Sequence, residues 1–107
     1  MQTVIEAIAE PRRREILRLV RDEEMTAGGI AAHFDVTRQA ISQHLRVLHD
    51  ARLVSERRDG TRRLYRVRPE GLIELRAFLD DFWSNRLEKL KREAEAEEKK
   101  GRAANRR

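Results

Sequence analysis

The apolar periodicity of the sequence changes near Leu53, and this change constrains the fold most strongly. Before it, apolar residues recur three and four positions apart, which is the spacing of amphipathic helices. After it, segments 53–58 and 61–67 alternate and contain β-branched residues, which is typical of strands. Asp59-Gly60 between them favours a two-residue type I′ turn. The sequence therefore predicts helices followed by one β-hairpin.

Two helices are predicted near the N-terminus. Val4, Ile5 and Ile8 indicate a first helix that ends near Glu10. Pro11 begins a second helix, because its missing N–H costs nothing at the first helical position.

A short helix, a tight turn and a longer helix follow in the sequence. Thr26 is a good N-cap for the third helix, and Thr37 for a fourth that ends near Asp50. Asp35-Val36 forms the turn between them. Two helices around a tight turn, followed by a hairpin, predict a winged helix-turn-helix.

The chain after the hairpin is predicted to be a long helix and a tail. Pro69 ends the second strand, and a helix runs from about Glu70 past Leu90. The predicted fold class is mainly α with a small β-hairpin, in the order α-α-α-α-β-β-α. The winged helix-turn-helix domain occupies residues 1–92, and the charged residues 93–107, which lack an apolar stripe, are expected to be disordered.

Positive charge is concentrated in the middle of the chain. Residues 37–68 carry nine basic and three acidic side chains, a net charge of +6, against −2 for residues 1–36 and +1 for residues 69–107. Such a patch favours a polyanionic partner, although a solubilising surface is the alternative interpretation.

The predicted fourth helix has one apolar and one polar half on a helical wheel. Arginine can bond bidentately to guanine and glutamine to adenine, so the polar half suits base edges in a major groove. Residues 38–49 contain neither Glu nor Lys, which usually dominate solvated faces. The polar half consists of Arg38, Gln39, Ser42, Gln43, Arg46, His49 and Asp50.

Arginines also flank the predicted hairpin tip. Arg57 and Arg58 precede Asp59-Gly60, and Arg62 and Arg63 follow it. A thin basic ribbon suits the minor groove or the flanking phosphates of a DNA duplex.

The predicted last helix carries an apolar stripe that is longer than this small domain can cover. Exposed on a monomer, it would be a larger patch than soluble proteins usually tolerate, so the sequence predicts a homodimer. An effector pocket near Trp83 is the alternative use. The predicted interface residues are Val4, Ile8, Leu72, Leu75, Leu79, Phe82, Trp83, Leu87 and Leu90.

Several classes of protein are excluded or disfavoured. The chain has no cysteine, which excludes disulfides, zinc fingers and thiol chemistry. No signal peptide and no apolar run near the ~20 residues of a membrane span is visible, so we expect a soluble cytoplasmic protein without a membrane partner. No nucleophile with a base, phosphate loop or metal cluster is recognisable, so an enzyme is not predicted. His44 lies in the apolar half of its helix and is interpreted as a hydrogen-bonded packing residue.

Three stretches carry a resemblance to a known family: AIAEPRRREILRLV (7–20), MTAGGIAAHFDVTRQAISQHLRVLHDARLV (25–54) and ERRDGTRRLYRVRP (56–69). They resemble the ArsR family of bacterial winged-helix repressors. The resemblance implies a homodimer that represses transcription from a near-palindromic double-stranded DNA operator. By position it implies operator contacts from Thr37, Arg38, Gln39, Ser42, Gln43 and Arg46, and flanking contacts from the wing residues Arg58, Thr61, Arg62 and Arg63.

The sequence departs from the family's metal sensors. Their thiolate site corresponds to residues 24–30, which contain no cysteine, and the last helix has Asp80, Asp81 and Glu88 but no histidine. Carboxylates alone make poor zinc sites, so neither a metal nor another cofactor is predicted. A metal- or small-molecule-responsive repressor and a helical protein-interaction module with incidental basic charge are the alternatives. The sequence identifies no effector.

Overall fold

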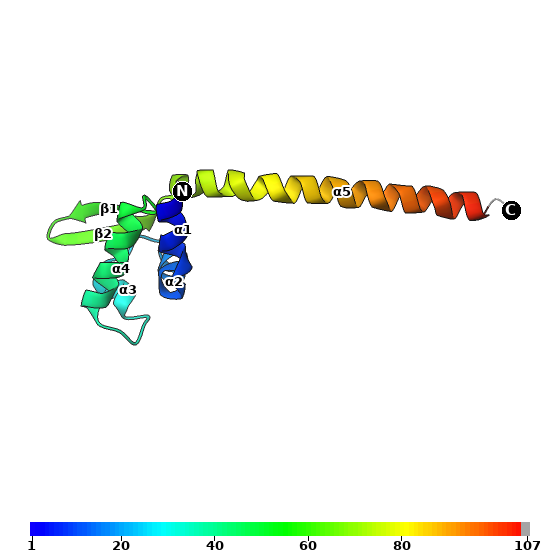
Figure 1. Ribbon diagram of the computed structural model, residues 1–107. Coiled ribbons are helices and arrows are strands. Elements are labelled where there is room, and N and C mark those ends of the chain that lie inside the picture. The colour runs from blue at the N-terminus through cyan, green and yellow to red at the C-terminus, as the bar shows by residue number, and fades with distance from the viewer. Residues whose placement is uncertain (106–107) are drawn as a thin grey trace. The chain divides into compact units, whose positions relative to one another are not determined.

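The computed structural model describes residues 1–105 and has the predicted order of helices and strands (Figure 1). The chain divides after Leu75 into two compact units, which are described separately. The elements are α1 (Gln2–Ala9), α2 (Pro11–Leu19), α3 (Ala27–Ala31), α4 (Arg38–Asp50), β1 (Val54–Asp59), β2 (Arg62–Val67), the 3-10 helix η1 (Pro69–Leu72) and α5 (Ile73–Asn105).

Threonine side chains begin the two helices of the helix-turn-helix. The Thr26 hydroxyl accepts a hydrogen bond from the Gly29 N–H at 3.0 Å, and the Thr37 hydroxyl accepts one from the Ala40 N–H at 3.1 Å. Each hydroxyl satisfies an N–H group that has no partner within its helix. Both predicted N-caps are confirmed.

Arginines at the start of α2 satisfy the end of α1. Arg13 donates to the carbonyl oxygens of Ala7 at 2.6 Å and Glu6 at 3.1 Å, and Arg14 donates to that of Ile8 at 2.6 Å. Cations are disfavoured in the first turn of a helix but favoured at the C-terminal end of one. The basic run therefore serves the preceding helix rather than its own.

The hydrophobic core of the first unit lies between α2, α3, α4 and the start of β1. Val4 and Ala7 of α1 also belong to it. The largest fully buried side chains are Ile16, Val20, Ile30, Ile41, Leu45, Leu48, Leu53 and Val54.

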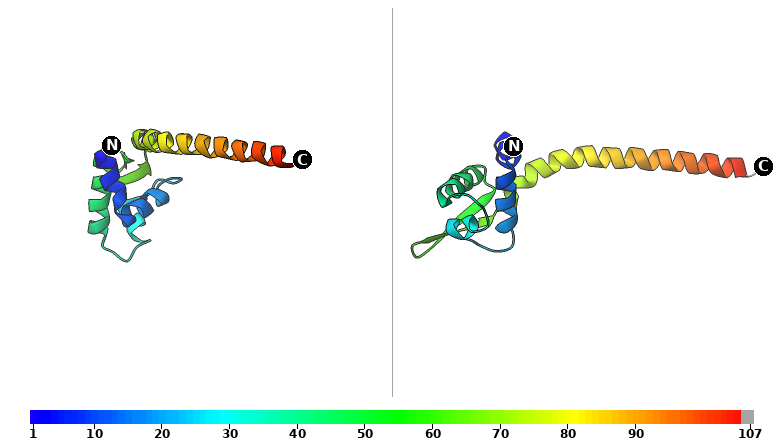
Figure 2. Two further views of the ribbon diagram at one scale, coloured as in Figure 1. Left: turned by 45° about the vertical axis from the view of Figure 1, so that its right-hand side comes forward. Right: turned by 90° about the horizontal axis from the view of Figure 1, so that it is seen from below.

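The hairpin loop is shifted by one residue from its predicted position. Asp59 pairs with Arg62, so the loop residues are Gly60 and Thr61 rather than Asp59 and Gly60. Gly60 has a φ of +65°, whereas Thr61 has no positive φ. A type I′ turn needs positive φ at both loop residues, so this combination fits a type II′ turn instead. Figure 2 shows the hairpin projecting from the helices of the first unit.

A third segment pairs with the hairpin, which the sequence analysis did not predict. The Met25 N–H donates to the Tyr65 carbonyl at 3.0 Å, and the Tyr65 N–H donates to the Met25 carbonyl at 2.8 Å. This one-residue bridge fastens β2 to the segment between α2 and α3.

Helix α5 extends well past the predicted end of order. The sequence predicts disorder for residues 93–107, whereas α5 continues to Asn105; residues 106 and 107 lie outside the described part. Alanine, glutamate and lysine are strong helix formers, and pairs such as Glu88 and Arg92, 3.9 Å apart, add local support. The missing apolar stripe removes packing partners but not helical preference.

Within residues 1–105, no helix combines the length and apolar character needed to cross a bilayer.

Candidate nucleic-acid interface

A groove of ≈ 920 Å³ lies between the polar side of α4, the start of α3 and the hairpin. Four arginines, two carboxylates and a histidine are among its lining residues, so its charge is positive on balance. The groove is lined by Thr26, Ala27, Gly28, Arg38, Ser42, Leu45, Arg46, His49, Asp50, Glu56, Thr61, Arg62, Arg63 and Tyr65.

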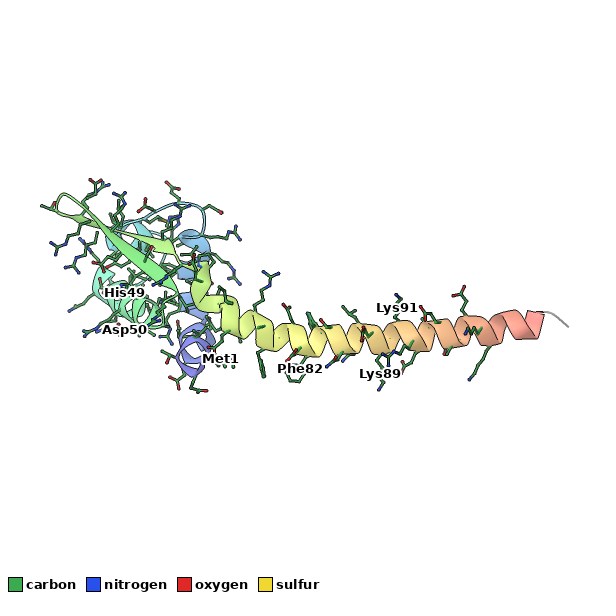
Figure 3. The ribbon with its side chains drawn as sticks, turned by 90° about the horizontal axis from the view of Figure 1, so that it is seen from above. Met1, His49, Asp50, Phe82, Lys89 and Lys91 are labelled. Carbon is green, nitrogen blue, oxygen red and sulfur yellow. The ribbon has the colours of Figure 1, made fainter. Side chains whose placement is uncertain are left out.

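Helix α4 has the two faces predicted for it. Ile41, Leu45 and Leu48 are buried at intervals of four and three residues and hold the helix against the core. The predicted polar half is exposed along its whole length. His49 and Asp50, labelled in Figure 3, continue this half to the end of the helix. Both also line the groove.

The predicted operator readers are all exposed, but only some of them line the groove. Arg38, Ser42 and Arg46 lie along it, whereas Gln39 and Gln43 are exposed outside it. Thr37 is the sixth predicted reader, and its hydroxyl caps α4.

Arg38 lies over Gly28 at the start of α3. A Cβ atom at Gly28 would lie 3.9 Å from the guanidinium carbon of Arg38, which is ordinary van der Waals contact. The absent side chain leaves this part of the groove open beside the guanidinium.

The hairpin arginines differ in how firmly carboxylates hold them. Arg57 donates from Nε to Glu24 Oε2 at 3.0 Å and from Nη2 to Oε1 at 3.2 Å, a bidentate pair. This pair lowers the pKa of Glu24 and raises that of Arg57. Arg57, which the sequence grouped with the basic ribbon, is therefore paired with a carboxylate of the same protein, although its side chain stays 57% exposed.

The predicted wing residues are distributed on both sides of the tip. Thr61, Arg62 and Arg63 line the groove, whereas Arg58 does not. Arg62 lies 3.9 Å from an oxygen of Asp59, and both side chains are exposed. Within residues 1–105, Arg58 has no carboxylate at ion-pair distance.

Glu56 and Tyr65 are groove residues that the sequence analysis did not single out. They are paired opposite each other in the hairpin. Burial raises the pKa of Tyr65, and the Glu56 charge raises it further, while Arg63 acts in the opposite direction. The strand alternation around the two-residue loop could have placed both on one face.

The histidines do not form a metal site. Among the described residues, no three His, Asp or Glu side chains are grouped so that they could hold a metal ion. His44 is half-buried, and its Nδ1 lies 3.4 Å from Nη1 of Arg13, which is the packing role predicted for it.

Comparisons with known proteins agree with this architecture. Residues 10–56 match the model of a family described as "Bacterial regulatory protein, arsR family". The chain is also 44% identical over 82 residues to HTH-type transcriptional regulator Rv2034 of Mycobacterium tuberculosis, which is 77% of each chain. The chain belongs to the arsR family. It is therefore a DNA-binding transcriptional regulator with a winged helix-turn-helix fold.

Two further similar proteins cover more than half of the chain. Transcriptional repressor SdpR of Bacillus subtilis is 45% identical over 60 residues, which is 56% of this chain and 67% of SdpR. A winged helix-turn-helix DNA-binding domain of a possible ArsR-family regulator from Mycobacterium bovis, described as homodimeric, is 31% identical with a TM-score of 0.63. That match covers 78% of this chain and 77% of the other.

The apolar residues predicted for an arsR-type dimer interface fall into two groups. Val4 is buried in the core of its own unit, and Ile8, Leu72 and Leu75 are half-buried against that core. Val4 therefore has little surface left for a partner. The remaining residues are exposed on α5: Leu79, Phe82, Trp83, Leu87 and Leu90. Phe82, labelled in Figure 3, contacts Phe78 edge-to-face with the ring centroids 5.1 Å apart.

Proposed function

We propose that this arsR-family protein is a repressor that binds a near-palindromic double-stranded DNA operator as a homodimer. In this proposal α4 reads base pairs in the major groove, and the hairpin contacts the DNA beside it. The observation that carries the proposal is the basic groove between the exposed polar half of α4 and the arginines of the hairpin.

The side chains along α4 suit base recognition. Arg38 and Arg46 can bond bidentately to guanine, and Ser42 between them can bond to a base or a phosphate. Gln39 and Gln43, exposed on the same half, suit adenine. Because Ile41, Leu45 and Leu48 of the opposite half are buried, these side chains are presented from a helix that the core holds in place.

The hairpin supplies contacts that do not depend on sequence. Arg58, Thr61, Arg62 and Arg63 lie at or near its tip, and arginines on a thin ribbon suit phosphates or the minor groove. These contacts would add affinity and salt dependence rather than base preference.

The exposed apolar residues of α5 support pairing of two copies. A soluble monomer rarely exposes a large contiguous apolar patch, so a second copy is the natural cover. Two recognition helices about 34 Å apart would read successive major grooves, which explains a near-palindromic operator. A repressor of bacterial transcription would act in the cytoplasm.

Quantitative DNA binding by substituted proteins tests the proposal. Arg38→Ala and Gln43→Ala should relax base preference, because each removes one base contact. Arg62→Ala should weaken binding to all sequences alike and reduce the salt slope of log affinity by about one unit. Arg18→Ala, which removes an exposed arginine of α2 outside the groove, is the matched control.

Binding would be measured by fluorescence anisotropy at several salt concentrations, on selected and mixed-sequence duplexes. The proposal fails if the wild-type protein does not bind DNA, or if all three substitutions behave as Arg18→Ala does. Without DNA binding, a helical protein-interaction module is the remaining interpretation of the exposed α5 face.

A further inference from the structure

A carboxylate lies within the groove proposed for DNA. Glu56 of β1 lines the groove, and its side chain is only 28% exposed. A negative charge near the phosphates of a bound duplex is unfavourable by Coulomb's law. The basic character of the groove does not explain why the Glu56 carboxylate lies there.

The hairpin register gives Glu56 its neighbours. Residues opposite each other in an antiparallel pair lie on the same face, so Glu56 shares a face with Tyr65, and Arg58 shares that face with Arg63. Glu56 and Arg63 are diagonal neighbours on it, and Glu56 Oε1 lies 3.4 Å from Arg63 Nε. Arg57 alternates to the opposite face, where Glu24 holds it.

The two arginine–glutamate pairs differ in geometry. Glu24 engages two nitrogens of Arg57 at 3.0 and 3.2 Å, which consumes one edge of the guanidinium. Glu56 makes a single, longer ion pair with Nε of Arg63, whose side chain stays 54% exposed and lines the groove. The two arginines are similarly exposed, Arg57 at 57%, but of the two only Arg63 lines the groove.

We propose that Glu56 is a positioning residue that holds Arg63 toward the groove, so that the guanidinium of Arg63 binds a DNA phosphate. This inference rests on the proposed function. Glu56 itself contacts no DNA and acts through Arg63, because fixing the side chain before binding reduces the rotamer entropy lost on binding. Tyr65 lies opposite Glu56 on the same face of the hairpin.

The sign of one substitution effect tests this proposal. Removing a negative charge from a DNA-binding groove should tighten binding on charge alone. If Glu56 positions Arg63, Glu56→Gln should instead weaken binding to a mixed-sequence DNA duplex, on the order of fivefold. Asp59→Asn is the matched control, because it removes a carboxylate from the same hairpin that lies 3.9 Å from Arg62 with both side chains exposed. It should bind slightly more tightly than the wild type.

A double-mutant cycle separates positioning from a general loss of structure. In the Arg63→Ala background, Glu56→Gln should no longer weaken binding, because the side chain that it positions is absent. Thermal denaturation of each variant shows whether the fold is retained. Binding by Glu56→Gln as tight as the wild type, or an equal loss in both backgrounds, overturns the proposal.

The controls keep this proposal distinct from the one it rests on. If the wild-type protein does not bind the duplex at all, the proposed function is wrong, and the positioning role falls with it. If the wild type binds and Arg62→Ala weakens binding while Glu56→Gln does not, only the positioning role is wrong.

Discussion

Arg52 has a φ of +62°, the only positive φ of a non-glycine residue within residues 1–105. It follows the C-cap of α4, where the Leu53 N–H donates to the Leu48 carbonyl at 2.9 Å and the Arg52 N–H donates to that of His49 at 3.0 Å. This is the hydrogen-bond pattern of a Schellman motif, in which glycine is the usual residue at this position. The Schellman motif turns the chain from α4 into β1, and it places Arg52 in a backbone conformation that strains a residue with a Cβ atom.

Arg52→Gly should raise the free energy of unfolding by about 0.5–1 kcal/mol, because glycine adopts this conformation without the Cβ penalty. Urea denaturation followed by circular dichroism would measure the change. Arg52→Ala is the control: it removes the side chain but keeps Cβ, so it should give no comparable gain. A glycine variant no more stable than the alanine variant would show that this backbone conformation is not strained.

The helix starts could be predicted from single residues because capping is a local interaction. Thr26 and Thr37 each bond to an N–H three residues away, and no distant part of the chain takes part. The pair of Glu24 and Arg57 could not be predicted in this way, because 33 positions separate the two residues. Only the folded hairpin brings them together.

At the scale of elements, the hairpin is attached to the helices by its core residues and by specific polar links, among them the hydrogen bond from the Val67 N–H to the Val20 carbonyl at 2.9 Å. A two-stranded hairpin is marginally stable alone, so its attachment to the helices matters. The bridge between Met25 and Tyr65 and the ion pair between Glu24 and Arg57 join it to the segment between α2 and α3. Glu24 and Met25 are adjacent in sequence, so these two links attach the hairpin to one short segment.

The ion pair predicts a pH-dependent contribution to stability. Arg57 lowers the pKa of Glu24 in the folded protein, so its contribution is present above the ordinary pKa of glutamate and is lost as the pH falls through the lowered value. Arg57→Gln should therefore unfold at a lower temperature than the wild type at pH 7. The difference should shrink below about pH 4.

Thermal denaturation across this pH range would check the expectation. Arg58→Gln is the control, because Arg58 lies in the same strand without a carboxylate partner among residues 1–105. The difference in unfolding temperature between this variant and the wild type should not change as Glu24 is protonated. A constant difference for Arg57→Gln at every pH would show that the pair contributes nothing to stability.

The remaining differences from the sequence expectations also have physical reasons. Asp59-Gly60 and Gly60-Thr61 both supply the glycine that a tight loop needs, and strand pairing decides between the two registers. Met25 pairs as a single residue, which has no alternation for a pattern to reveal. The length of α5 reflects helix propensity, which the periodicity of apolar residues does not measure.

At the scale of the whole molecule, the exposed face of α5 is the main reason to expect two copies. Trp83 is 66% exposed and Leu87 65%, although both are large and apolar. Trp83→Glu should give a monomer at micromolar concentration, because a charge would be buried in the interface. It should also weaken operator binding, because each half-site would then be bound separately.

Sedimentation equilibrium would measure the mass of the variant. Ser84→Glu, which adds the same charge to the next residue of α5, is the control and should stay dimeric. A wild-type protein that is already monomeric, or a Trp83→Glu variant that remains dimeric, would contradict the assignment of this face.

Selection of bound duplexes from a random DNA pool would show directly whether two copies of α4 read an operator together. A homodimer that reads the major groove with α4 predicts enrichment of an inverted repeat. The centres of its half-sites should lie about 10–10.5 base pairs apart, or a multiple of that spacing. Enrichment of no sequence, or of a single site without two-fold symmetry, would contradict operator reading by a homodimer.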